Sequence, residues 1–176
     1  MIVMLIKKTE VANNELKEKL RTIISSTTKI SSVETQVITA LEKVKMVGIK
    51  NIGYVSGVIS SDGVKHIPAN VKVLEMYTEF YRSYTPFPVF SSSDIFHGRY
   101  VEKFNLTQSE WVGFWNNILK SETITDVFMT PRWEVSNGAT EEHKTAKALN
   151  LNIHYHHKHV DLNRILRNIR RDLEST

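Results

Sequence analysis

The chain contains no cysteine among its 176 residues. A disulfide scaffold, a thiolate zinc site and a cysteine nucleophile are therefore excluded. The chain also lacks any apolar run near the roughly 20 residues that a membrane-spanning helix needs. The apolar opening, residues 1–6, is too short for a secretory signal, and its lysines follow it instead of preceding it. These absences favour an intracellular protein, and we expect a cytoplasmic one that does not associate with membranes.

The charges are nearly balanced, with 23 Lys and Arg against 19 Asp and Glu, a net charge of +4. Basic residues are densest near the C-terminus, at Arg164, Arg167, Arg170 and Arg171, with acidic residues interspersed. This pattern is typical of a solvated helix face; the alternative is a surface that contacts a phosphate backbone. Because the positive surplus is small, we do not expect nucleic acid as a partner.

From residue 51 onward, short apolar runs alternate with segments of helical period. Strands are predicted over residues 52–56, 87–90, 126–129 and 151–155. Helices are predicted from Pro68, from the capping box Thr107-Gln-Ser-Glu110, over 139–149 and from Asp161. This alternation predicts the α/β class: a Rossmann-like (flavodoxin-like) three-layer domain whose mostly parallel sheet has four or five strands. Ligands bind beyond the carboxyl ends of such strands, which singles out the loops 57–66, 91–106 and 130–138.

The first 48 residues precede the first clear strand and have a different pattern. Two amphipathic helices are predicted there, over residues 13–24 and 32–47, and residues 1–6 form either an extra strand or part of the first helix. We therefore expect a helical extension over 1–48 and the α/β domain over 49–176. The apolar stripes of the extension either pack on the sheet domain or form an oligomer contact. Exposed stripes of this size usually mark interfaces, so we predict a homodimer or a higher homo-oligomer, with either the N-terminal helices or the helix that carries Trp111 in the contact.

One carboxylate falls on the apolar face of a predicted helix. At 100° per residue, Ala139, Glu142, Ala146 and Leu149 lie within about 80° of one another. An unpaired buried charge is costly, so Glu142 needs a role. In a structural role, it accepts hydrogen bonds from the first amides of the helix or pairs with a nearby basic group. In a functional role, it serves as a partly buried nucleophile or base beside a ligand.

The residues around Glu142 form part of a longer motif. Tyr54-Val-Ser-Gly57 lies on the first predicted strand, and Trp133-Glu-Val-Ser-Asn-Gly-Ala139 leads to Glu142 and His143. Together these segments resemble the nucleoside 2-deoxyribosyltransferase-like superfamily, in particular its phage and bacterial branch. The resemblance covers residues 51–155. It implies cleavage or transfer of the N-glycosidic bond of a 2′-deoxynucleoside or its 5′-monophosphate, so the implied partner is a nucleoside or nucleotide.

The resemblance also implies roles for individual residues. Glu142 would attack the anomeric carbon, and Tyr54 would hydrogen-bond and orient that carboxylate. Ser136 and Gly138 would meet the 5′ end of the sugar, Trp133 belongs to the same binding motif, and Gly57 would let its loop approach the base. Ser136-Asn-Gly138 is expected to form a turn in which glycine permits a tight bend.

The chain departs from the family at one catalytic position. Active members carry an aspartate in the helix before the third strand, and the matching residue here is Asn117. Asparagine cannot act as a general acid or base. Asp94, on the loop after the second strand, is a possible substitute. The departure leaves open an alternative function, a non-catalytic protein of the same fold that binds or senses a nucleotide.

Two other features of the sequence have ordinary structural roles as the expected interpretation. His154, His156, His157 and His159 form a histidine cluster near the last predicted strand. On a strand, His154 and His156 share a face, and two imidazoles can bind zinc or nickel. No cysteine or well-spaced carboxylate completes a site, so a polar strand end is expected, with no metal and no cofactor. Trp111 and Trp115, four residues apart on a predicted helix, are expected in the core.

Overall fold

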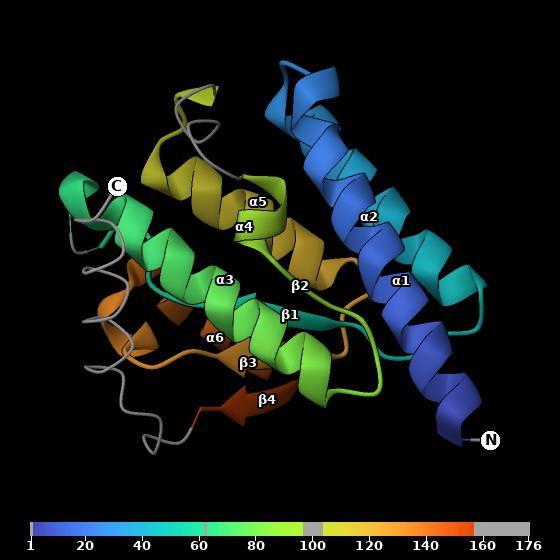
Figure 1. Ribbon diagram of the computed structural model, residues 1–176. Coiled ribbons are helices and arrows are strands. Elements are labelled where there is room, and N and C mark those ends of the chain that lie inside the picture. The colour runs from blue at the N-terminus through green and yellow to red at the C-terminus, as the bar shows by residue number, and fades with distance from the viewer. Residues whose placement is uncertain (1, 62, 97–103, 157–176) are drawn as a thin grey trace, which may run out of the picture.

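The computed structural model describes residues 2–61, 63–96 and 104–156. Its main elements are α1 (Ile2–Ile23), α2 (Ile30–Met46), β1 (Gly53–Ser56), α3 (Ile67–Tyr84), β2 (Val89–Ser91), α4 (Ser92–Ile95), α5 (Gln108–Lys120), β3 (Asp126–Met129), α6 (Asn137–Ala148) and β4 (Asn152–Tyr155) (Figure 1). No helix among them is long and apolar enough to cross a membrane. The helix predicted from Asp161 and the arginines that follow it lie outside the described residues.

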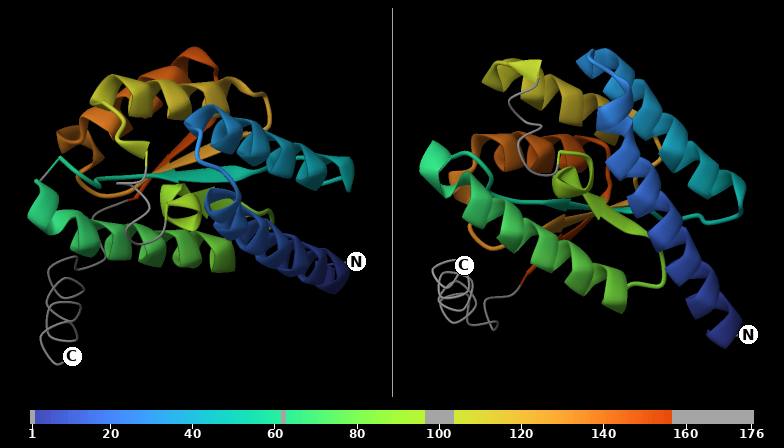
Figure 2. Two further views of the ribbon diagram at one scale, coloured as in Figure 1. Left: turned by 90° about the horizontal axis from the view of Figure 1, so that it is seen from above. Right: turned by 45° about the horizontal axis from the view of Figure 1, so that its top comes forward.

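The four strands form one sheet in the order β2-β1-β3-β4, and each neighbouring pair is parallel. The sheet lies between α3 on one side and α5 and α6 on the other, as Figure 2 shows. The predicted α/β class, with its parallel sheet and flanking helices, is thereby confirmed. The chain runs from β1 to the neighbouring β2 and then crosses to β3 on the opposite side of β1. The carboxyl ends of β1 and β3 therefore flank the topological switch point, where such folds bind ligands.

Alternate residues of the strands supply two separate hydrophobic clusters. Val55 and Phe128 pack with Leu74 of α3 on one side of the sheet. Tyr54 and Val127 belong to the larger cluster on the other side, which includes side chains of α5 and α6. Because side chains alternate along a strand, each of these buried strands contributes to both layers.

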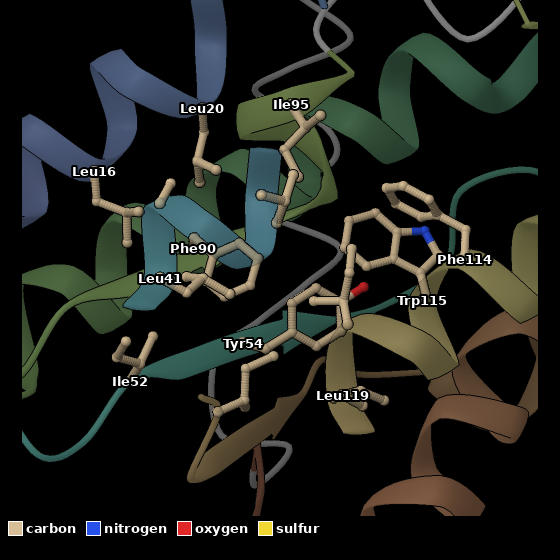
Figure 3. Close-up of a cluster of buried hydrophobic side chains, with 14 of the residues drawn as sticks. Leu16, Leu20, Leu41, Ile52, Tyr54, Phe90, Ile95, Phe114, Trp115 and Leu119 are labelled. Atoms are coloured by element: carbon tan, nitrogen blue, oxygen red, sulfur yellow. The ribbon is translucent and has the colours of Figure 1, made fainter. Parts of the chain in front are cut away.

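The N-terminal helices pack on the sheet domain of the same chain. Residues 2–6 belong to α1, which settles the choice between strand and helix. Leu16 and Leu20 of α1 and Leu41 of α2 share one core with Ile52 and Phe90 of the sheet region (Figure 3). Most of the described stripe residues are therefore buried within the chain, although Val47 at the end of the second stripe is exposed. The homo-oligomer stays a prediction, and the buried part of the described stripes gives it no support.

β2 is an edge strand, and side chains satisfy the backbone groups of Val89. The Val89 N–H donates to Asn13 Oδ1 of α1 at 2.9 Å. The Val89 carbonyl accepts from Arg82 Nε of α3, also at 2.9 Å. Close by, Thr9 Oγ1 donates to the carbonyl of Pro86 at 2.9 Å. α1 and α3 thus anchor this edge of the sheet through hydrogen bonds as well as apolar packing.

Candidate functional site

A cavity of about 280 Å³ opens at the carboxyl ends of β1 and β3. This volume is slightly below the range of roughly 300–1,000 Å³ that is typical of small-molecule sites. Residues from all three predicted loops line it, together with the facing sides of three helices: Gly57, Ile59, Ser60, Ile67, Val71, Ser92, Ser93, Phe96, Leu106, Gln108, Trp111, Trp115, Ser136, Gly138, Ala139 and Glu142. Within this described lining, Glu142 is the one ionisable side chain.

Glu142 reaches the cavity from the buried face of α6. Ser136 is the N-cap of this helix, and its Oγ accepts a hydrogen bond from the Ala139 N–H at 3.3 Å. Ala139, Glu142 and Ala146 are buried, as the periodicity predicts, and Glu142 is 7% exposed. Leu149, which the same stripe predicts to be buried, is 39% exposed because α6 ends at Ala148. The carboxylate is therefore held inside the protein by the register of the helix.

Two hydroxyls from one face of β1 bond to the Glu142 carboxyl group. Ser56 Oγ donates to Glu142 Oε2 at 2.5 Å. The Tyr54 hydroxyl forms a second side-chain hydrogen bond with the same carboxyl group. Residues 54 and 56 point to the same side of the sheet because side chains alternate along a strand. The predicted contact between Tyr54 and Glu142 is present, whereas Ser56 was not foreseen.

The protonation states follow from burial and from these hydrogen bonds. Burial raises the pKa of Glu142 to about 7, and the hydrogen bonds from Ser56 and Tyr54 oppose that rise. Burial also raises the pKa of Tyr54 well above its usual value, and the nearby Glu142 charge raises it further. Near neutral pH, Glu142 is therefore available in both forms while Tyr54 keeps its proton as a donor.

Gly57 brings the ends of β1 and β3 close together beside this carboxyl group. A Cβ at position 57 would lie 2.3 Å from Thr130 Oγ1 and 3.3 Å from Leu74 Cδ1. A side chain larger than hydrogen therefore cannot occupy this position without a shift of its neighbours. Gly57 lines the cavity, and the absence of a side chain allows this close approach. Its role toward a base stays a prediction.

Ser136 and Gly138 also line the cavity, but the local structure differs from the predicted turn. Ser136 is the N-cap, and Gly138 is the second residue of α6. A Cβ at Gly138 would have its nearest neighbours, Gln108 Nε2 and Ser136 Oγ, at 3.9 Å, an ordinary contact distance. Glycine is therefore not required by a bend at this position. It leaves open space on the cavity wall.

Aromatic rings form the side of the cavity next to α5. Trp115 stacks on Tyr54 with ring centroids 5.1 Å apart, and Phe96 meets Trp111 edge-to-face at 4.7 Å. Figure 3 shows Tyr54 between Phe90 and Trp115. Trp115 is buried in the core as expected, while Trp111 is only partly buried and both tryptophans line the cavity. Spacing along the helix identified this apolar side, but it did not show that the side borders a cavity.

Asn117 does not belong to the cavity. It is exposed, and its Nδ2 donates to Glu34 Oε2 of α2 at 3.2 Å. Phe114 and Ile118 of the same helix face the core, which turns residue 117 outward. The expected catalytic position of Asn117 is therefore not supported by its location.

Asp94 and Trp133 also lie outside the cavity lining. Asp94 is buried, accepts from the Ser91 N–H at 2.9 Å and pairs with Arg82 at 2.7 Å, so it caps α4 and anchors it to α3. Its neighbours Ser92 and Ser93 reach the cavity instead. Trp133 packs against His143 of α6, with the two ring centroids 4.2 Å apart.

His154 of β4 and His156, which follows this strand, have ordinary partners. His154 Nε2 lies 2.7 Å from Asp126 Oδ1, and His156 Nδ1 lies 3.1 Å from the Tyr81 hydroxyl. Across the part of the chain that the structure describes, no three His, Asp or Glu side chains are grouped to hold a metal ion. His157 and His159 lie outside the described residues.

Comparisons of this chain with protein-family models, with curated proteins and with solved structures found no match. What is established is an α/β domain with a four-stranded parallel sheet. The resemblance of the sequence motifs to a family therefore supports a hypothesis about function and no family assignment.

Proposed function

We propose that this protein cleaves or transfers the N-glycosidic bond of a 2′-deoxynucleoside or its 5′-monophosphate, with Glu142 as the nucleophile. The observation that carries the proposal is the buried Glu142 carboxyl, held by two hydroxyls at the wall of a cavity at the switch point. The resemblance of the segments around Tyr54 and Glu142 to the nucleoside 2-deoxyribosyltransferase-like superfamily adds support. No cofactor is part of the proposed reaction.

The proposed chemistry has two displacements at the anomeric carbon. An oxygen of the Glu142 carboxylate forms a bond to C1′, and the electron pair of the C1′–N bond leaves with the base, which takes a proton from water. Water or a second base then attacks C1′ and gives up a proton to the hydroxide left by the first step, while the C1′–O bond breaks and its electron pair returns to the carboxylate. A carboxylate suits both steps because it is a fixed nucleophile and its charge stabilises the oxocarbenium-like transition states.

The lining of the cavity suits a nucleoside in two respects. Phe96, Trp111 and Trp115 offer ring surfaces to a planar base. Hydroxyl groups from Ser92, Ser93 and other serines of the lining offer hydrogen-bond partners to a sugar. In this arrangement the base lies against α5, and the anomeric carbon faces α6.

Base release is the direct test of the proposed reaction. The purified full chain is incubated with the four 2′-deoxynucleosides and, separately, their 5′-monophosphates, and free base is separated by chromatography. We expect release by the wild type and by Glu141→Gln, whose side chain lies outside the cavity lining, and none by Glu142→Gln. Absence of free base from every substrate, or full activity in Glu142→Gln, refutes the proposal. Incorporation of an added second base separates a transferase from a hydrolase.

A second candidate function is a non-catalytic nucleotide-binding protein. It is favoured by the described cavity lining, in which no second carboxylate accompanies Glu142 to assist the leaving base. Thermal unfolding with each nucleoside and nucleotide tests it. A ligand at 100 times its Kd stabilises the folded state by about 2.7 kcal/mol, so a binder raises Tm clearly without base release. A Tm that no nucleoside or nucleotide changes contradicts this candidate.

A further inference from the structure

Ser56 is the last residue of β1, but its backbone is held firmly by the neighbouring strand. It is 1% exposed, and it is in register with Met129 of β3. Its carbonyl accepts from the Thr130 N–H at 2.9 Å, and the next residue, Gly57, packs closely on Thr130. The sheet therefore fixes the position of the Ser56 Cβ, and only the hydroxyl can rotate.

The orientation of the Glu142 carboxyl group is not fixed by its own helix. α6 fixes the Glu142 backbone, but three side-chain torsions separate it from the carboxyl oxygens, and the last of these has a broad energy minimum. The 2.5 Å hydrogen bond from Ser56 Oγ to Oε2 joins β1 to α6 across 86 positions of sequence. It restricts the orientation of the carboxyl plane relative to the sheet and the cavity.

We infer that Ser56 is a positioning residue, which fixes the orientation of the Glu142 carboxyl and stabilises its ionised form. For its catalytic consequence the inference rests on the proposed function of Glu142. A hydroxyl bonds more strongly to a carboxylate than to a neutral acid, so it favours ionisation. From β1 the titratable group that also faces the carboxyl is Tyr54. The charged neighbours on α6, Glu141 and Lys144, pair with each other on its exposed side.

A purely structural role for Ser56 makes a different prediction. If the hydrogen bond only ties β1 to α6, its loss lowers stability and leaves the ionisation of Glu142 unchanged. If Ser56 stabilises the carboxylate, its loss moves the titration midpoint of Glu142 upward. The midpoint therefore distinguishes the two roles, whereas a melting temperature does not.

The experiment follows the glutamate carboxyl groups of the full chain by ¹³C NMR between pH 4 and pH 10. Glu142→Gln identifies the Glu142 signal by its disappearance. In Ser56→Ala we expect the midpoint of Glu142 to rise by about one pH unit, the effect of losing one hydrogen bond to a charged group. Ser56→Thr, which keeps the hydroxyl, returns the midpoint toward the wild-type value. Ser121→Ala removes a hydroxyl that bonds to Ile118 and Thr123 at the far end of α5 and leaves the midpoint in place.

An unchanged Glu142 midpoint in Ser56→Ala overturns the inference. Base release by the same proteins, measured against pH, separates this outcome from a failure of the proposed function. A moved NMR midpoint without base release in the wild type leaves the positioning role standing and refutes the enzyme. Base release by the wild type, together with an unchanged Glu142 midpoint in Ser56→Ala, supports the enzyme and refutes the positioning role of Ser56.

Discussion

Replacing Glu142 with glutamine should alter how the free energy of unfolding depends on pH. In the folded chain, burial raises the pKa of Glu142 from its ordinary 4.5 to about 7. The folded state therefore binds a proton more tightly than the unfolded state. The stability that this proton contributes is fully present below pH 4.5 and is lost as the pH rises through 7. Glutamine keeps the shape of the side chain and never ionises.

The magnitude follows from the displacement of the pKa. Each unit of pKa shift corresponds to about 1.4 kcal/mol of unfolding free energy. The shift from 4.5 to about 7 therefore changes the stability by roughly 3 kcal/mol across the titration. Glu142 is nearly inaccessible to solvent, with 7% exposure, so little of this is screened. We expect the stability of Glu142→Gln relative to the wild type to increase by about 3 kcal/mol between pH 4.5 and pH 8.

Urea unfolding at several pH values measures this difference. Other titrating groups cancel in the comparison with the wild type because they are the same in both proteins. Glu141→Gln is the matched control: the chemical change is identical one residue earlier, where the side chain is 42% exposed and pairs with Lys144 at the surface. The difference in unfolding free energy between Glu141→Gln and the wild type should vary by less than about 1 kcal/mol between about pH 4.5 and pH 8. A flat difference for Glu142→Gln would show that its pKa is not raised, and the reasoning from burial would be wrong.

Three further substitutions test individual contacts of the fold, each by urea unfolding. Asp94→Asn breaks a buried ion pair and should cost about 3 kcal/mol, and a loss below about 1 kcal/mol would contradict its anchoring role. Gly57→Ala places a Cβ 2.3 Å from Thr130 Oγ1 and should cost about 1–3 kcal/mol. Adding Thr130→Ala should recover part of that loss. If the double variant instead loses the sum of the two single losses, the clash with Thr130 is not the cause. Asn13→Ala leaves a buried N–H without its acceptor and should cost about 1–3 kcal/mol, against about 0.5 for the exposed Asn14→Ala; equal losses would refute this assignment.

The layer structure could be predicted because local periodicity encodes it. The strand predicted over residues 126–129 is the observed β3, and the other three predicted strands overlap β1, β2 and β4 within two residues at each end. The capping box at Thr107 forms as predicted, with the Glu110 carboxylate accepting from the Thr107 N–H at 2.8 Å. These features depend on residues close together in sequence, so a pattern along the chain is sufficient to find them.

Only those site residues were predicted that helix periodicity or the sequence motif identifies. The burial of Glu142 followed from its face of α6. The partnership with Ser56 depends on two elements separated by 86 positions, which periodicity does not relate. Asn117 was aligned to a catalytic position by motif, but the core-facing residues of α5 turn it outward. A motif specifies the residue type at a position, whereas the direction of a side chain depends on the whole helix.

The contacts at Val89 have a consequence for how this sheet can grow. A strand that pairs alongside β2 needs the N–H and C=O of Val89, and both are already bonded, to Asn13 and to Arg82. Addition at that edge would require the side chains of α1 and α3 to be displaced first. The chain thus protects this edge of the sheet itself: two side-chain hydrogen bonds must break before another strand, including one from a second copy, can pair with β2.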